Sequence, residues 1–411
     1  MLRPERLRLA LEALREAVQD SSVSDERVSS ALVSTTVEEL LAEIAGADAS
    51  ENLAHQAALA LRTFEEIGLP QLSPGITGQI IQGIGKTYER LGDNTNAYDA
   101  YHRALTLAHE AEDASLAAGC QRRMGRVLTN MARWNAASEH LNQSYSSFKK
   151  IQDRLGSAEA LCDIGSLYYQ QGKLEDAEKS YTEALQMAEE LGDQQLVINT
   201  RNNLGVLANI RGDHEAATAQ YRQCVALAEE LGDEALVAQS YHNLGMTHSD
   251  LKEWPLSIEC FERALEIANK KGLAGIMGTS HLNKAEIYIE LNDVTMAAVA
   301  CGKALSIFKT SGDKLGEAES LRVLGEVFAR RGNEASALRM YDQSLAITTR
   351  ADTPLEVAET YRGLGQMCER MGRSQQAMEA YQEALKYFER VQAHRDRQNT
   401  ERDLQRVREA L

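Results

Sequence analysis

Along most of this chain, hydrophobic and small residues recur at helical spacing, in paired blocks that are separated by glycine. Between residues 157 and 193, apolar positions follow one another three or four residues apart as far as Tyr168, and Gly172 then interrupts them. The pattern resumes at Ala177 and ends at Gly192. One face of an α-helix repeats with this spacing, and glycine commonly ends a helix. The pattern therefore predicts a helix, a tight turn, a second helix and another turn.

The same block returns every forty residues without an insertion or a deletion. One column of small residues consists of Gly85, Gly125, Gly165, Gly205, Gly245, Ala285, Gly325 and Gly365. A second column, mostly aromatic, consists of Tyr101, Leu141, Tyr181, Tyr221, Phe261, Cys301, Tyr341 and Tyr381. A single helical hairpin cannot bury its apolar face alone, so the period predicts a stack of hairpins. The predicted repeats are 74–113, 114–153, 154–193, 194–233, 234–273, 274–313, 314–353 and 354–393.

The small column is expected to let the first helix of a repeat approach its partner closely, and the aromatic column to fill the space between successive hairpins. Pro255 and Pro354 fall where helices should begin, at a position that tolerates a missing N–H. Thr353 is then the expected N-cap before Pro354.

Both ends of the chain depart from the period. Residues 34–73 fit the frame weakly, with Ala57 and Leu61 forty residues before members of the columns, and we interpret them as a degenerate repeat. Residues 1–33 are expected to form an N-terminal helical segment. Residues 394–411 alternate charges with a few apolar residues, which favours a polar capping helix; a disordered tail is the alternative.

The segment "NLGVLANIRGDHEAATAQYRQCVAL" (203–227) resembles a tetratricopeptide repeat in its order of leucine, glycine, alanine and tyrosine. The usual unit has about 34 residues, and the forty-residue form is similar to Pins-type adaptors, kinesin light chain and bacterial tetratricopeptide regulators. The resemblance implies an all-α fold, a right-handed α-solenoid whose concave groove binds protein segments. Co-chaperones of the family pair a lysine with an asparagine in one repeat, and no repeat here has that pair.

Composition and charge narrow the function classes. The chain has 44 basic and 61 acidic residues, a net charge of −17, which disfavours binding to nucleic acids or anionic membranes. Only five prolines occur, in agreement with helices throughout. The six cysteines form no Cys-x-x-Cys pair, so neither a zinc site nor a disulfide framework is indicated. Cys224 and Cys301 stand at small or apolar positions of the repeat and are expected in the core. No stretch is apolar enough to insert into a membrane. A reducing, cytoplasmic location is expected.

The stretch Gly85-Lys86-Thr87 has the letters that end a phosphate-binding loop. That motif requires glycine at position 80, where this chain has isoleucine, and a preceding β-strand, which the pattern does not predict. Gly85 already belongs to the small column. His242 and His248 are six residues apart, which does not place them on one helical face. We therefore expect no cofactor, no metal, no catalytic residue and no enzymatic activity.

If the first helix of each repeat lines the inner wall, residues at fixed offsets from the small column face the groove. Basic residues are concentrated there in the first two repeats and amides in the middle, which predicts a groove for a peptide with an acidic segment. Ordinary solvated helix charges are the alternative interpretation. The candidate contact residues are Gln82, Lys86, Arg90, Arg122, Arg123, Arg126, Asn130, Tyr169, Asn199, Asn202, Asn209, His242, Arg322 and Arg362.

The sequence thus predicts a non-enzymatic adaptor that binds a protein or peptide in its groove. The alternative is a regulatory sensor whose solenoid binds a small peptide or effector and changes conformation. A sensor would need an output domain from elsewhere, since the pattern shows none in this chain.

Overall fold

The computed structural model describes residues 73–409, apart from 91, 352 and 392. The predictions for residues 1–33 and 34–73, including Ala57 and Leu61, lie outside the described residues except for Ser73. Within them the structure contains only α-helices, seventeen in number, and no strand. The fold is an all-α solenoid of stacked hairpins, as predicted. In each repeat we call the first helix the A helix and the second the B helix.

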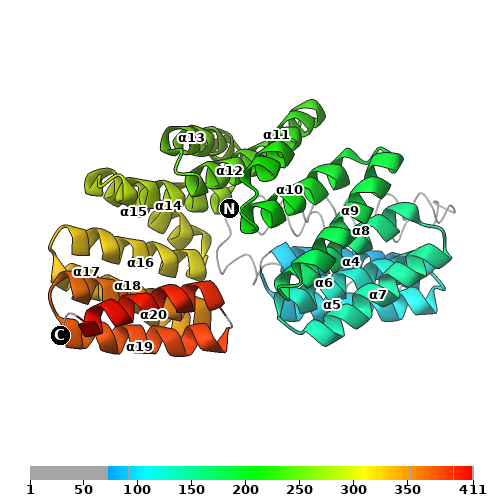
Figure 1. The fold of residues 1–411 in the computed structure, drawn as a ribbon. Coiled ribbons are helices and arrows are strands. Elements are labelled where there is room, and N and C mark those ends of the chain that lie inside the picture. Colours follow the sequence, from blue (N-terminus) through cyan, green and yellow to red (C-terminus); the bar gives the residue numbers. More distant parts are fainter. Residues whose placement is uncertain (1–72, 91, 352, 392, 410–411) are drawn as a thin grey trace, which may run out of the picture. The chain divides into compact units, whose positions relative to one another are not determined.

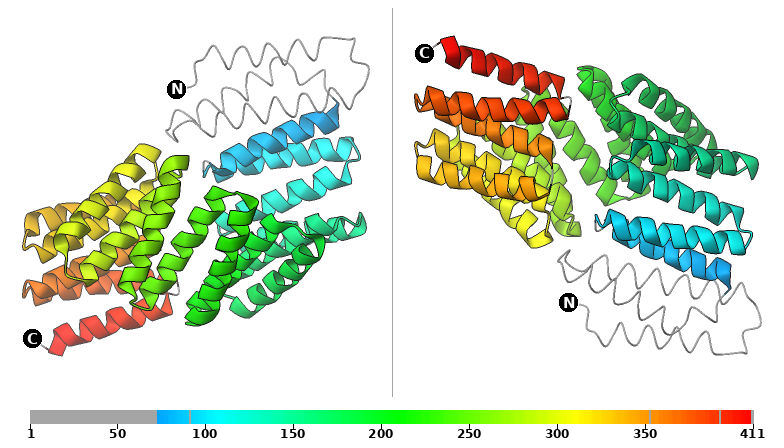
Figure 2. Two further views of the ribbon diagram at one scale, coloured as in Figure 1. Left: turned by 90° about the horizontal axis from the view of Figure 1, so that it is seen from above. Right: turned by 90° about the horizontal axis from the view of Figure 1, so that it is seen from below.

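The chain divides into two compact units at Gly232–Asp233, between the fourth and the fifth repeat. Figures 1 and 2 show the helices of each unit stacked side by side. The described helices of the first unit are α4 (Pro74–Arg90), α5 (Asn94–Glu110), α6 (Ala114–Asn130), α7 (Trp134–Lys150), α8 (Arg154–Gln170), α9 (Leu174–Leu191), α10 (Gln194–Ile210) and α11 (His214–Leu231). Those of the second unit are α12 (Glu234–Asp250), α13 (Trp254–Lys271), α14 (Ala274–Glu290), α15 (Val294–Ser311), α16 (Lys314–Arg330), α17 (Glu334–Arg350), α18 (Pro354–Arg370), α19 (Ser374–Arg390) and α20 (His394–Glu409).

Local sequence explains where these helices begin and end. Asp193 caps α10 by accepting a hydrogen bond from the Leu196 N–H at 2.8 Å. Gly192 ends α9 in the left-handed conformation, with φ of 71°. Pro354 is the first residue of α18, as predicted. The prediction for Thr353 was half right: it occupies the N-cap position but makes no side-chain cap, because its hydroxyl donates to the Thr348 carbonyl oxygen at 3.3 Å.

The two residue columns pack against each other inside each hairpin. A Cβ on Gly85 would lie 2.6 Å from the ring of Tyr101, too close for any carbon contact. The sixth repeat exchanges both partners: Ala285 replaces the glycine and Cys301 the aromatic residue, and both are fully buried in one cluster. The aromatic column therefore packs first within its own hairpin, rather than only between hairpins as the sequence suggested.

Contacts between repeats give each unit its curvature. The A helix of each repeat contacts the A helix of the next within both units, for example α6 with α8 and α14 with α16. Successive B helices of the described residues make no contact of comparable extent. Because the A helices lie closer together than the B helices, each unit curves with its A helices on the inner face. The polar candidates from the sequence lie on these A helices.

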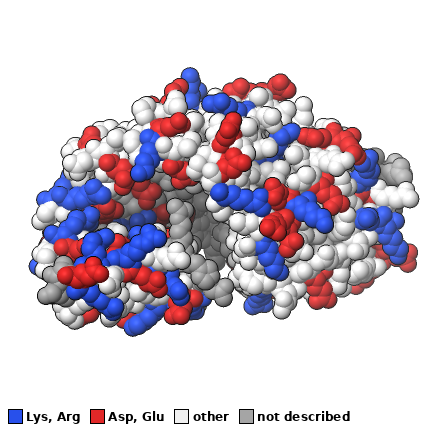
Figure 3. All heavy atoms as spheres, in the orientation of Figure 1, with Lys and Arg blue, Asp and Glu red and all other residues white. Residues whose placement is uncertain are grey.

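The described C-terminal helix follows the same forty-residue frame. α20 packs on α19, with Leu404 and Val407 buried in the cluster that contains Tyr381. All six cysteines are buried and none forms a disulfide, and Cys224 and Cys301 lie in the core as expected. On the face shown in Figure 3, acidic and basic side chains are interspersed over the helices. Among the described helices, none has the length and apolar character needed to cross a bilayer.

Candidate functional site

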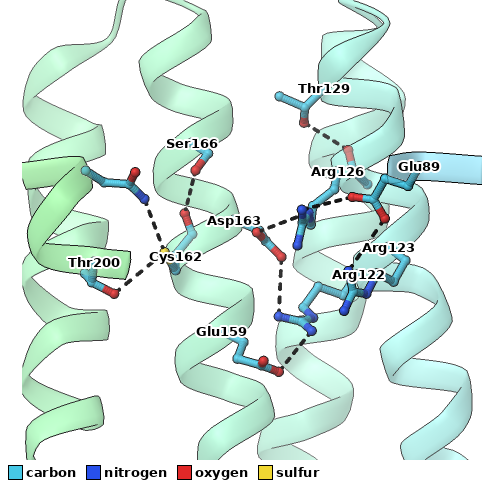
Figure 4. Close-up of polar contacts among 12 residues, drawn as sticks. Glu89, Arg122, Arg123, Arg126, Thr129, Glu159, Cys162, Asp163, Ser166 and Thr200 are labelled. Carbon is cyan, nitrogen blue, oxygen red and sulfur yellow. Dashed lines mark hydrogen bonds and ion pairs between the residues drawn. The ribbon is translucent and has the colours of Figure 1, made fainter. Parts of the chain in front are cut away.

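On the inner face of the first unit, a carboxylate of the first repeat holds two arginines of the second. Glu89, at the end of α4, lies 2.9 Å from Arg126 Nη2 and 3.6 Å from Arg123 Nη1. Tyr101 of the aromatic column donates its hydroxyl to Glu89 Oε2 at 2.8 Å. Burial and this carboxylate raise the pKa of Tyr101 well above its usual range, so the phenol stays a donor. Glu89 is thus fixed between its own hairpin and the next (Figure 4).

The network continues into the third repeat. Asp163 of α8 lies 3.6 Å from Arg122 Nη1 and 3.7 Å from Arg126 Nε, and Glu159 lies 3.0 Å from Arg122 Nη2. Asp163 is also the main cause that raises the pKa of Arg126. We call this set the inner ladder; its members are Glu89, Arg122, Arg123, Arg126, Glu159 and Asp163 (Figure 4). It joins the A helices of three consecutive repeats.

The inner ladder changes the interpretation of the predicted basic cluster. Its three guanidinium groups face three carboxylates, so the set is neutral when all of them are charged. The side chains of Arg122 and Arg123 are largely covered, whereas that of Arg126 keeps 40% exposure. The arginines that the sequence suggested for binding an acidic ligand are therefore largely paired with carboxylates of the chain itself. Arg126 is the ladder arginine with the greatest exposure.

Other candidates of the first unit lie along the same inner face with different exposure. Gln82 is half-buried and its amide donates to Cys120 Sγ at 3.5 Å. Lys86, Asn130 and Asn199 are exposed and Tyr169 is half-buried. Asn209 contacts His214 Nδ1 through its side-chain oxygen at 2.8 Å. The side chain of Arg90 lies outside the described part of the structure.

Several candidate residues that stand three positions before a member of the small column lie between neighbouring A helices. Arg122, Asn202 and His242 are all buried. His242, 6% exposed, places Nδ1 2.8 Å from Ser280 Oγ in the next A helix. Burial lowers the pKa of His242 to about 4, so this ring is neutral at neutral pH. These residues shape the wall between neighbouring repeats, and their side chains are largely withdrawn from its surface.

In the second unit, the inner face gathers carboxylates around one arginine. Arg322 of α16 lies 3.2 Å from Glu286, 3.8 Å from Glu359 and 3.9 Å from Glu319. We call these four residues the Arg322 cluster. The three glutamate side chains keep 41–47% exposure. Partial burial, together with the neighbouring Glu286 and Glu359, raises the pKa of Glu319 to about 7.

Arg362, the last candidate, contacts the C-terminal helix. Its guanidinium lies 3.5 Å from Asp403 and 4.0 Å from Asp396 of α20. Sequence reasoning missed Asp403 and Asp163 as partners, because neither stands at an offset assigned to the groove. The signal that could have found them is opposite charge about one repeat apart: Asp163 lies 41 positions after Arg122 and Asp403 lies 41 after Arg362. Among the described residues, no group of three or more His, Cys, Asp or Glu is arranged to hold a metal ion.

Stacked helical hairpins with a polar inner face define the class of α-solenoid repeat proteins. The chain belongs to the tetratricopeptide repeat family: two models of that description match it. One covers residues 117–190, 156–230, 196–270, 276–350 and 337–390, and the other covers residues 81–115. The comparison with curated proteins gave no match.

Solved structures share the fold at low sequence identity. A signal transduction ATPase (STAND) protein with a tetratricopeptide repeat sensor from Pyrococcus horikoshii superimposes with a TM-score of 0.61 and 12% identity, over 93% of this chain and 56% of that one. A Rap protein complexed with competence and sporulation factor superimposes with a TM-score of 0.55 and 13% identity, over 81% of this chain and 98% of that one. Aspartyl phosphate phosphatase F from Bacillus subtilis superimposes with a TM-score of 0.54 and 12% identity, over 91% of this chain and 93% of that one. At these identities the likeness concerns the fold alone.

Proposed function

We propose that this protein is a non-enzymatic adaptor that binds a peptide or protein segment on the inner face of its A helices. The observation that carries the proposal is the polarity of that face in the first unit. Asn199 and Asn130 are exposed and Tyr169 is half-buried. Amides and a tyrosine hydroxyl at such positions suit the backbone of a peptide, whose donors and acceptors they can satisfy.

The acidic character of the ligand is a finer part of the proposal. A carboxylate of the bound segment would contact Arg126, the ladder arginine with the greatest exposure. It would share this guanidinium with Glu89 and Asp163, so its gain in affinity is modest and dependent on salt. We expect a single acidic residue, rather than an acidic run, at this point of the segment.

A second candidate is a regulatory sensor that binds a small peptide or effector and changes conformation. What favours it is the nature of two proteins with the same fold: one contains a tetratricopeptide repeat sensor, and another was solved with a bound factor. Mass spectrometry of material that copurifies with the protein distinguishes the candidates. A protein supports the adaptor, and a short peptide or metabolite supports the sensor.

Substitution on the inner face then tests the binding surface. Arg126→Gln and Tyr169→Ala should each weaken binding of the copurified ligand several-fold in a titration. Arg222→Gln is the matched control, because Arg222 is an exposed arginine on the B helix α11. Equal affinity of all three variants and the unmodified protein would overturn the proposal.

A further inference from the structure

The eighth repeat departs from most of the others at one position of its A helix. Three residues after each member of the small column, most repeats place a large side chain. The residues at this offset are Tyr88, Leu128, Tyr168, Ala208, His248, Tyr288, Phe328 and Cys368. Cys368 is 5% exposed and packs in the cluster that contains Tyr341 and Tyr381. Its thiol takes up much less volume than an aromatic ring, so space is expected beside it.

A cavity of about 510 Å³ lies beside Cys368, lined by residues of α17, α18 and α19. Leu338, Leu364 and Cys368 give it an apolar lining. Arg373 and Gln376, which also line it, are exposed, so the cavity is open to solvent. An apolar cavity of this volume with a few polar groups at its mouth has the character of a ligand site.

The third repeat shows which group fills the equivalent place when the large residue is present. Tyr168 stands five repeats before Cys368, and its ring packs against the cluster that contains Ile164. Lys173 Nζ lies 5.7 Å from the centroid of the same ring. The residues equivalent to Ile164 and Lys173 in the eighth repeat are Leu364 and Arg373, and both line the cavity. The cavity therefore has the surroundings of an aromatic ring but lacks the ring.

Two lining residues suit an aromatic ring better than an aliphatic side chain. Tyr361 is half-buried and stacks on Tyr387 of α19, with ring centroids 6.1 Å apart, which gives the cavity an aromatic wall. Arg373 keeps 43% exposure and donates to Glu334 Oε2 at 2.7 Å, so its guanidinium is held at the mouth. Aromatic pairs and a cation over a ring face both add attraction that an aliphatic side chain does not receive.

The fourth repeat, which also has a small residue at this offset, is built differently. Its A helix carries Ala208, but Arg201 of the same helix donates to Glu189 of α9 at 2.5 Å and to Gln220 of α11 at 3.0 Å. Arg201 thus joins the two neighbouring B helices. The equivalent residue in the eighth repeat is Tyr361, so no arginine at this position joins α17 to α19. A small residue together with an aromatic wall distinguishes the eighth repeat.

We propose that this cavity binds an aromatic side chain, tyrosine or phenylalanine, of a segment of a partner protein. The ring takes the place that Tyr168 has in the third repeat, with its face toward Arg373 and Tyr361 beside it. Gln376 at the mouth can bond to the backbone of the segment, as amide side chains do. Two B helices contribute to this surface. It is therefore a second binding surface besides the inner face, and the inference does not depend on the proposed function.

Saturation-transfer NMR on the full chain tests the inference, because this method detects weak binding of small ligands. The probes are terminally blocked peptides of five residues, with tyrosine, leucine or alanine between two glycines on each side. The tyrosine peptide should bind about fivefold more tightly than the leucine peptide, and the alanine peptide should bind least. Equal affinities of the tyrosine and leucine peptides would overturn the assignment of an aromatic residue.

Cys368→Tyr tests the place of binding, because it supplies the ring that other repeats have at this offset. The substituted ring should fill the cavity, leave the thermal unfolding midpoint unchanged or raised, and abolish binding of the tyrosine peptide. Cys368→Ser is the matched control, since it leaves the cavity open and should retain binding. Undiminished binding of the tyrosine peptide to folded Cys368→Tyr would overturn the inference.

Arg373→Gln changes an exposed residue, and so decides the matter even if Cys368→Tyr does not fold. It should weaken the tyrosine peptide about threefold through loss of the cation over the ring. Arg133→Gln is its control, because Arg133 is the exposed arginine at the equivalent position of the second repeat. Equal affinities of these two variants would overturn the inference. Binding on the inner face is decided separately, by Arg126→Gln with the copurified ligand.

Discussion

The hairpins of the two units carry the same columns of small and aromatic residues, yet the charges on their inner faces are paired differently. In the first unit, three arginines and three carboxylates form the inner ladder and neutralise one another across three repeats. In the second unit, three carboxylates share the single guanidinium of Arg322. The framework fixes the fold, while the residues at inner offsets decide what each face can bind. Charge on such a face has to be judged by pairs of neighbouring repeats.

The largest expected effect comes from removing the shared arginine of the second unit. Arg322→Gln leaves three carboxylates together, and their repulsion should destabilise the protein by about 2 kcal/mol at pH 8. The loss stays at this size because the side chains are exposed and water screens part of the repulsion. Arg122→Gln is the matched change in the first unit. Arg122→Gln should lower the free energy of unfolding by less than Arg322→Gln, since Arg126 remains beside Asp163. Urea unfolding followed by circular dichroism measures both, and a larger loss for Arg122→Gln would contradict the contrast.

Tyrosines of the aromatic column also differ in whether their hydroxyl has a hydrogen-bond partner. Tyr101→Phe and Tyr381→Phe each remove a hydrogen bond to a carboxylate and should cost about 1.5 kcal/mol. Tyr341→Phe removes a hydroxyl that has no partner in the described part of the chain, and should be neutral or slightly stabilising. Denaturant midpoints of the three variants decide this. A clear loss of stability for Tyr341→Phe would show that its hydroxyl is already satisfied.

The caps of two A helices give a smaller contrast. Asp193→Ala, which removes the cap of α10, should cost about 1 kcal/mol. Thr353→Ala should cost much less, because the Thr353 hydroxyl bonds back to Thr348 and does not cap α18. Thermal unfolding of both variants checks the order, and similar losses would contradict it.

The smallest effect is the response of stability to pH. The pKa of Glu319 in the folded protein, about 7, lies above its ordinary value of 4.5. A carboxyl group of this kind stabilises the fold most when it is protonated, and that contribution is lost as pH rises through 7. The unfolding midpoint should therefore decrease slightly between pH 5 and pH 8, and Glu319→Gln should reduce the decrease. An identical pH profile for Glu319→Gln would remove Glu319 as the cause.

The fold could be predicted almost completely from the sequence, because a forty-residue period places each turn. Gly192 and Pro354 stand at helix ends for reasons of backbone geometry that act locally. Thr353 shows the limit of such reasoning. A threonine before a helix suits an N-cap, but its hydroxyl has a second acceptor within reach, and local sequence does not decide between the two.

The site was less predictable, because charge pairing depends on residues about one repeat apart. Arg122 and Arg126 had the positions and charge of a basic groove, and only the structure shows Asp163 between them. His242 illustrates a second gap. Its offset suggested an exposed ligand contact, whereas curvature brings neighbouring A helices together and buries the ring against Ser280.

Hydrogen–deuterium exchange of the full chain, with and without the copurified ligand, is the strongest test of binding on the A helices. We expect slower exchange in the A helices of the first unit, α6, α8 and α10, and no slowing in the B helices α7 and α9. Protection confined to the B helices would show that the inner face is not the binding surface.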